Sequence, residues 1–137
     1  MSNPDQEMSP TLVRYLREAA GQPFAWGSLD CSLFMAGWVR ARTGIDPAAA
    51  LRGRYATERG ALRLARRLGG MEAVARRQMA AAGFATTCEP VPGDVGIIAH
   101  PCIGPTCAVL TEYGWAIKSL QGVAVVRFPA IISWSLA

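Results

Sequence analysis

Apolar residues recur at helical spacing in the first part of the chain and in short alternating runs in the last part. Leu12, Tyr15, Leu16 and Ala19 share one helical face, which predicts a helix that begins after Ser9-Pro10 and ends at Gly21. Residues 30–42 are apolar on nearly all sides, which predicts a central, buried helix with Asp30 as its N-cap.

Two further helices are predicted over residues 59–68 and 71–82, separated by Gly69-Gly70, after a short turn or helix from Asp46 to Leu51. The later part changes character: short β-branched runs, separated by glycine and proline, predict an antiparallel meander with strands at 95–99, 107–112, 115–119 and 123–128. The predicted fold class is therefore α+β, with a Cys-bearing core helix packed on a C-terminal antiparallel sheet. We expect one domain over residues 1–137, divided into a polar arm (1–9), a mainly helical part (10–82), the sheet (86–128) and an apolar tail that packs back (129–137).

Composition supports a packed core and excludes two classes. With 137 residues, 51% hydrophobic and 18% charged, the chain is neither polar nor charged enough for wholesale disorder. No apolar run approaches the roughly 18 residues of a membrane helix. Residues 1–10 lack the basic and apolar regions of a secretory signal, so we expect synthesis in a cytosol and no signal peptide.

Positive charge is concentrated in the middle of the chain. Residues 40–77 contain ten arginines against Asp46, Glu58 and Glu72, whereas the net charge of the whole chain is +4. Such a region can bind nucleic acid, an acidic protein or an anionic wall polymer, or can simply be a solvated helix face. No nucleic-acid motif accompanies the charge, so we expect no nucleic-acid partner.

The four cysteines are Cys31, Cys88, Cys102 and Cys107. Without an export signal they do not predict a disulfide framework, and their spacing does not fit paired CxxC ligands of zinc. Two alternatives remain open: a zinc or iron–sulfur cluster assembled from distant segments, and four separate cysteines that act as small buried hydrophobes. We expect no cofactor and no metal.

Cys31 is the residue that the pattern singles out for chemistry. It falls in the first turn of the central helix, where free backbone N–H groups and the helix dipole favour a thiolate and could form an oxyanion hole. A cysteine nucleophile also needs a nearby base, and the alternative is a packed residue at a helix start.

The segment Trp26-Gly27-Ser28-Leu29-Asp30-Cys31-Ser32 resembles the nucleophile motif of NlpC-type cell-wall cysteine peptidases, which have a papain-like fold. Pro92-Gly93-Asp94-Val95 is similar to the turn that leads into their first core strand. Leu51-Arg-Gly-Arg-Tyr, Gly60-Ala-Leu-Arg and Gly69-Gly70 narrow the resemblance to a small related family encoded among tail genes of phages, prophages and gene transfer agents. The resemblance covers residues 10–128 and implies Cys31 as nucleophile, with Trp26, Asp30 and Ser32 along a substrate groove.

The same resemblance implies a histidine at the start of the second core strand, and this chain has Cys107 there. The third, polar residue of the site should come from the next strand, near Lys118 or Ser119, and neither is a usual partner of imidazole. His100, the only histidine, ends the first core strand and is the one possible substitute base.

The resemblance therefore implies a structural component of a phage or phage-like tail tip with a degenerate NlpC-like peptidase fold. Its expected partners are other tail proteins, of the hub and tip, together with peptidoglycan, and its expected location is the virion tail after assembly in the host cytoplasm. The first alternative is an active peptidoglycan peptidase that aids DNA entry, and the second is an arginine-rich nucleic-acid-binding module. A tail subunit should expose apolar surface, which we expect at residues 129–137 or in the Phe24–Leu29 loop.

Overall fold

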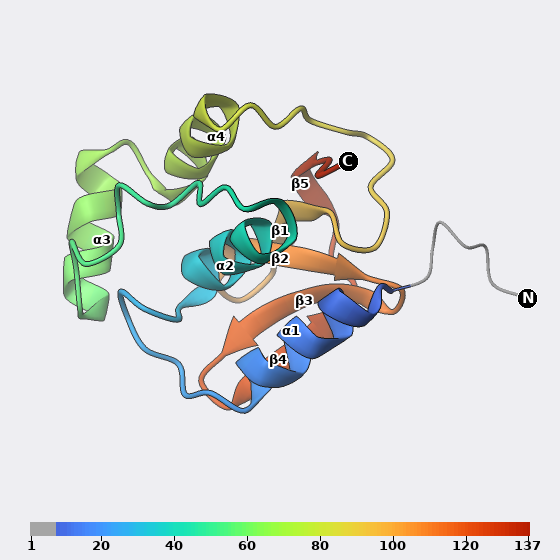
Figure 1. Cartoon of the computed structure of the whole chain (residues 1–137). Helices are drawn as coiled ribbons and strands as arrows, with labels where there is room; N and C mark the ends of the chain where they lie inside the picture. The colour runs from blue at the N-terminus through green and yellow to red at the C-terminus, as the bar shows by residue number, and fades with distance from the viewer. Residues whose placement is uncertain (1–7) are drawn as a thin grey trace, which may run out of the picture.

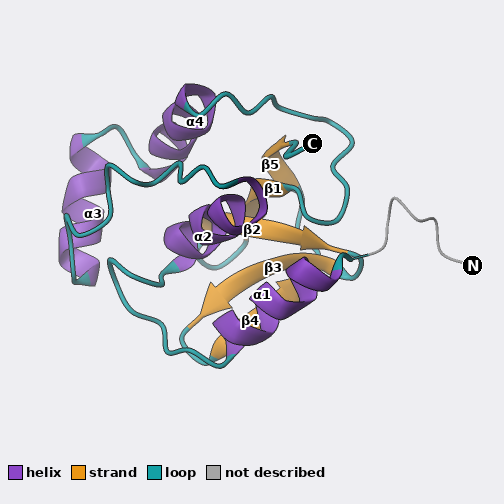
Figure 2. Ribbon diagram, viewed as in Figure 1, coloured by secondary structure: helices purple, strands orange, loops and turns teal. Residues whose placement is uncertain are grey.

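The computed structural model describes residues 8–137, and in this part of the chain four helices precede a five-stranded antiparallel sheet (Figures 1 and 2). The chain is thus α+β, as predicted. Residues 1–7 of the predicted polar arm lie outside the described residues. The elements are α1 (Pro10–Ala20), α2 (Cys31–Thr43), α3 (Glu58–Arg67), α4 (Met71–Ala81), β1 (Val95–His100), β2 (Gly104–Thr111), β3 (Gly114–Ser119), β4 (Gly122–Val126) and β5 (Ala130–Trp134).

The helices α1 and α2 begin at the side-chain caps that the sequence predicts. The Ser9 hydroxyl accepts a hydrogen bond from Leu12 N at 3.1 Å, and the Asp30 carboxylate accepts one from Leu33 N at 3.0 Å. Gly44, with φ of 82°, ends α2 in the left-handed conformation. The four predicted helices are confirmed to within about two residues, whereas residues 46–51 form turns rather than a helix.

The sheet has the order β4-β3-β2-β1-β5, which corrects the predicted organisation of the C-terminal residues. The four predicted strands are present, and part of the segment 129–137, predicted as a tail that packs back on the domain, forms a fifth strand, β5, that pairs with β1. Trp134 and Leu136 are buried, and among these residues Ile131 is the only large apolar side chain that is exposed. The apolar surface expected at the tail is therefore mostly core.

The connection from β4 to β5 forces the sheet to curl. These strands occupy opposite edges, and four gaps of about 4.8 Å would separate their axes by about 19 Å in a flat sheet. Only residues 127–129 connect them, and four Cα–Cα steps span at most about 14 Å. The two edges must therefore approach each other, and Phe128 packs against Ile98 and its neighbours on the inside of the curl.

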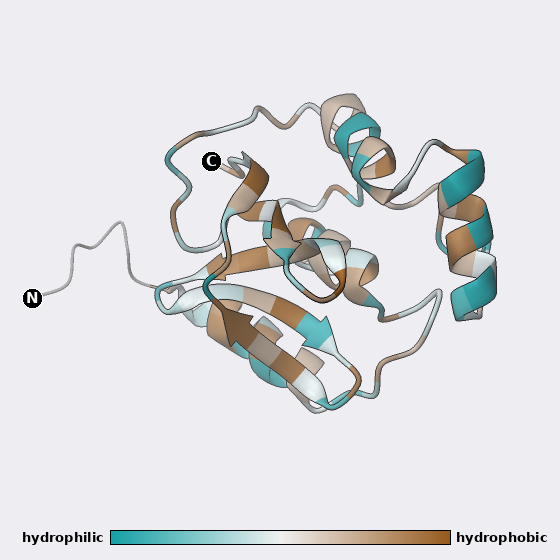
Figure 3. Cartoon of the chain, turned by 180° about the vertical axis from the view of Figure 1, so that it is seen from behind, coloured by the Kyte–Doolittle hydropathy of each residue, from teal (hydrophilic) through white to brown (hydrophobic). Residues whose placement is uncertain are grey.

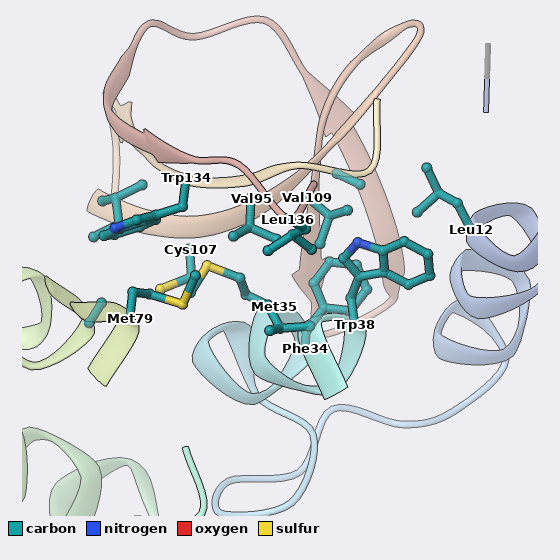
Figure 4. Close-up of a cluster of buried hydrophobic side chains, with 14 of the residues drawn as sticks. Leu12, Phe34, Met35, Trp38, Met79, Val95, Cys107, Val109, Trp134 and Leu136 are labelled. Carbon is teal, nitrogen blue, oxygen red and sulfur yellow. The ribbon is translucent and has the colours of Figure 1, made fainter. Parts of the chain in front are cut away.

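Each face of the sheet covers its own core cluster. On the outer face, Val95, Ile97, Cys107 and Val109 pack against α1, α2 and α4, together with Phe34 and other side chains (Figure 4). The inner face carries a smaller cluster of Ile98, Ala108, Trp115 and Ile117. Successive residues of a strand alternate between these faces, so sequence position on a strand decides which side chains can meet.

The helices do not share this core equally. Figure 1 shows α1 and α2 lying against the sheet, while α3 lies beside α4 and away from the strands. Within residues 8–137, no helix has the length and apolar character needed to cross a membrane.

The importance of β5 can be tested by changing Trp134, which is 2% exposed, and Ile131, which is 40% exposed on the same strand. We expect Trp134→Ala to lower the free energy of unfolding by about 3–5 kcal/mol, because it leaves a large cavity in the core. Ile131→Ala should cost less than about 1 kcal/mol in urea denaturation. Equal losses for the two variants would contradict the placement of residues 130–134 as a core strand.

Candidate functional site

Cys31 is the first residue of α2, and a buried carboxylate fixes its surroundings. Asp30 is 1% exposed and accepts hydrogen bonds from Leu33 N, from Gly27 N at 3.1 Å and from the Tyr55 hydroxyl at 2.6 Å. Both carboxylate oxygens are thus occupied. Asp30 holds the preceding loop and the start of α2 together and is not free to act as a base.

The loop before Cys31 lies directly against the backbone of residue 55. A Cβ placed on Gly27 would lie 2.0 Å from the carbonyl oxygen of Tyr55, and Gly27 has φ of +84°. Only glycine fits this close approach in this conformation. The glycine of the sequence motif therefore has a structural reason that is independent of catalysis.

The surroundings of Cys31 favour the thiol over the thiolate. Burial, and to a smaller extent the negative charge of Asp30, raises the pKa of the Cys31 thiol above its ordinary value of 9.0. Hydrogen bonds from the Ser32 amide and hydroxyl lower it, but by less. The direction of this shift is opposite to the expectation that the helix start favours a thiolate, because burial and the charge of Asp30 outweigh the hydrogen bonds at the helix start.

Cys107 lies directly beneath the first turn of α2. Its Sγ is 3.9 Å from the Ser32 hydroxyl oxygen and 3.5 Å from Met71 Sδ, and the side chain is 1% exposed. Figure 4 shows it pointing away from the sheet, toward Met35 and Met79. Burial raises its pKa strongly, so a neutral, packed thiol occupies the position where the resemblance implies a histidine.

His100 lies at the far end of β1 and on the other face of the sheet. Ile97 pairs with Cys107 on the outer face, so His100, three residues further on, lies about 10 Å along the strand and on the inner face. Its ring packs edge-on against Phe128 at 5.0 Å, and Nδ1 accepts hydrogen bonds from the amides of Cys102 and Ile103. The imidazole closes the β1–β2 turn and is not brought to Cys31.

The two residues near the third position that the resemblance implies, Lys118 and Ser119, use their polar groups for structural hydrogen bonds. Lys118 is 3% exposed and its Nζ donates to the carbonyl oxygens of Ala19 and Gln22, at 2.8 and 2.6 Å, at the end of α1. The Ser119 hydroxyl donates to Gly122 O. Burial lowers the pKa of Lys118, and its contacts make it a clasp between α1 and β3.

A cleft of about 940 Å³ opens beside Cys31, which is within the size range of ligand pockets. Its walls come from the start of α2, from α3 and α4, and from the β1–β2 and β3–β4 turns. Trp26, stacked edge-on against Phe24 at 4.8 Å, lines it together with Asp30 and Ser32. His100 also lines this cleft.

The four cysteines do not converge. Cys88 and Cys102 are exposed, Cys31 is half-buried and Cys107 is buried. Over residues 8–137, no group of three or more histidine, cysteine or acidic side chains is arranged to hold a metal ion. The alternative of a four-cysteine zinc or iron–sulfur cluster is therefore wrong for this part of the chain.

Two residues contact the site without having been assigned a role from the sequence. Tyr55 donates to Asp30 from 25 positions away, and Met71 contacts Cys107 from the first turn of α4. Tyr55 belongs to the Leu51-Arg-Gly-Arg-Tyr block, so the resemblance marked the segment but not the function of the side chain. No local signal links Met71 to Cys107.

The chain belongs to a family described as Domain of unknown function (DUF6950), whose profile matches residues 4–135. No curated protein and no solved structure matches the chain.

A comparison of Gly27→Ala with Gly53→Ala separates two costs in unfolding free energy: the steric clash with Tyr55 and the strain of a positive φ at a residue with a side chain. Both glycines have φ near +80°, but a Cβ at Gly53 meets nothing within 4 Å. We expect Gly53→Ala to cost about 1–2 kcal/mol of unfolding free energy and Gly27→Ala about 1–3 kcal/mol more, because the second also displaces backbone. Equal costs would contradict the contact with Tyr55.

The raised pKa of Cys31 predicts slow alkylation at neutral pH. Because a raised pKa keeps the thiol protonated to higher pH, the iodoacetamide rate at Cys31 should still be rising above pH 9.0. Peptide mapping by mass spectrometry should find Cys88 and Cys102 modified first and Cys107 last. A Cys31 that reacts fastest at neutral pH would show an activated nucleophile and contradict this arrangement.

Proposed function

We propose that this protein is a structural, non-hydrolytic component of a phage-like tail tip, built on a papain-like NlpC-type fold whose catalytic centre is incomplete. The observation that carries the proposal is the buried Cys107 under the start of α2, with the only histidine of the chain on the other face of the sheet.

The papain-like part of the proposal is supported by the position of Cys31. A cysteine in the first turn of a buried helix, packed on an antiparallel sheet that follows it in the chain, is the arrangement that the sequence resemblance implies. The Gly93-Asp94 turn leads into β1 as expected, and the Asp94 carboxylate accepts hydrogen bonds from Val91 N and Leu136 N. The turn thus ties the first and last strands of the sheet together.

The loss of hydrolysis follows from the chemistry of peptide cleavage. A cysteine peptidase needs a base to activate the thiol and an acid to protonate the leaving amine, and this assistance contributes a factor of about 10²–10⁴. Asp30 and Lys118 have their polar atoms engaged in structural hydrogen bonds, and Cys107 is neutral. Asp30, Cys107 and Lys118 are therefore not available for this proton transfer.

The structural role is supported by apolar surface around the cleft. Leu62, Ile103 and Leu120 are all large, apolar and more than 60% exposed, and all three line the cleft. Exposed apolar groups that gather at one place are typical of surfaces covered by another molecule. In an assembly, another subunit that covers this cleft would bury these side chains, and the peptidase-like fold would then serve binding instead of hydrolysis.

Hydrolysis of a peptidoglycan stem peptide by the purified protein is the direct test. We expect wild type and Cys31→Ala to be equally inactive, and Cys107→His to gain weak activity where the new imidazole reaches Cys31. Cys31→Ala should cost about 1 kcal/mol of stability and leave incorporation into tailed particles unchanged, as measured by co-sedimentation.

Two results would contradict the proposal. Hydrolysis by wild type that is lost in both Cys31→Ala and His100→Ala would establish an active peptidase with His100 as its base. If tailed particles purified from cells that produce this protein do not contain it, the proposed structural role is wrong.

A further inference from the structure

Helix α3 separates apolar and cationic side chains onto two faces. One face lines the cleft through Glu58, Ala61, Leu62, Leu64, Ala65 and Leu68. The other face carries four arginines at helical spacing, all of them exposed: Arg59, Arg63, Arg66 and Arg67. The alternating hydrophobic and hydrophilic bands of this helix are visible in Figure 3.

The arginines of α3 have no carboxylate partner among residues 8–137. The ion pairs in this part of the chain are Arg52–Asp46 and Arg76–Glu72, and neither involves α3. On a helical projection, Leu62 lies at the border between the two faces, and Arg59 and Arg66 both lie about 40–60° from it on the side away from the cleft, about one turn before and one turn after it along the axis. Positive charge thus lies along the rim of the cleft, next to an apolar side chain that is 61% exposed.

Two turns of the sheet add further exposed apolar side chains to the lining of the cleft. Ile103 in the β1–β2 turn and Leu120 in the β3–β4 turn are 64% and 78% exposed and line the same cleft. Three elements that are distant in sequence therefore present large apolar side chains around one opening. An occupant that covers them gains about 25 cal/mol for each Å² of apolar surface removed from water.

The charged groups that line the cleft do not neutralise the positive charge of the arginines at its rim. Asp30 is buried and fully hydrogen-bonded, and Lys118 is bound to two carbonyl oxygens, so Glu58 is the one exposed carboxylate that lines it. A ligand that complements this surface has apolar side chains that pack into the cleft. It also has negatively charged groups that pair with the arginines of α3. A nucleic acid matches the arginines but would place phosphates against Leu62, Ile103 and Leu120, where desolvation opposes binding.

We infer that the cleft docks an acidic, amphipathic segment of a partner protein, with its apolar side chains against Leu62, Ile103 and Leu120 and its carboxylates against Arg59 and Arg66. The inference rests on the proposed function, since a docking cleft must leave its occupant uncut. It adds the chemistry of the partner and assigns α3 as the element that recognises it.

Fluorescence polarisation with the full chain tests this inference. The probe is a fluorescein-labelled peptide with leucines on one helical face and glutamates on the other, and a second peptide has lysines in place of the glutamates. We expect the glutamate peptide to bind about tenfold more tightly than the lysine peptide. Arg59→Glu combined with Arg66→Glu should abolish or reverse this preference.

Matched variants separate the cleft from the rest of the surface. Leu62→Asp with Leu120→Asp should remove binding of the glutamate peptide, whereas Tyr113→Asp, at a residue 62% exposed and outside the cleft, should not. Arg14→Glu with Arg17→Glu makes the same change of charge on α1 and should keep the preference. Circular dichroism of each variant confirms that it remains folded.

Several outcomes would overturn the inference: no saturable binding of the glutamate peptide, tighter binding of a single-stranded oligothymidylate, tighter binding of a stem peptide, or binding that Leu62→Asp with Leu120→Asp leaves intact. Mass spectrometry of the recovered peptides reports on the proposed function separately. Cleavage of the stem peptide would overturn the proposed function, whereas absent binding without cleavage would overturn only the docking inference.

Discussion

The buried carboxylate of Asp30 is the interaction on which the arrangement of the site depends. It caps α2, holds the Gly27 amide and accepts the Tyr55 hydroxyl, so three segments of the chain meet at two oxygen atoms. A buried carboxylate is stable only when such donors replace water. The same carboxylate raises the pKa of Cys31, next to it in the chain. The group that builds the helix start therefore also helps to keep the thiol neutral.

A second constraint comes from the alternation of side chains across the curled sheet. Cys107 and Ile97 face α2, so the side chain of His100 falls on the inner face, where it packs against Phe128. Whether a strand residue can act as a base for Cys31 therefore depends on the face of the sheet to which its side chain points. Closeness in sequence to β2 is not sufficient.

Much of the fold followed from local signals. Ser9 and Asp30 mark helix starts, Gly69-Gly70 separates α3 from α4, and glycine and proline separate four strands. β5 was missed because its partner β1 is 35 residues away, and the nine-residue C-terminal segment has no turn signal that joins the two strands. The position of Cys31 at the start of α2 was predicted, whereas its raised pKa was not, because burial depends on helices and strands that close over it later in the chain. For the same reason, the contacts of Tyr55 and Met71 required the structure.

The central claim is that no imidazole reaches the thiol of Cys31. Since His100 is the only histidine, its ring-nitrogen resonances in NMR spectra report on this directly. We predict that these resonances coincide in wild type and Cys31→Ala, because Cys31 lies over the outer face of the sheet and the imidazole lies on the inner face. Resonances that shift when Cys31 is removed would place the imidazole within hydrogen-bonding distance of the thiol and contradict the account.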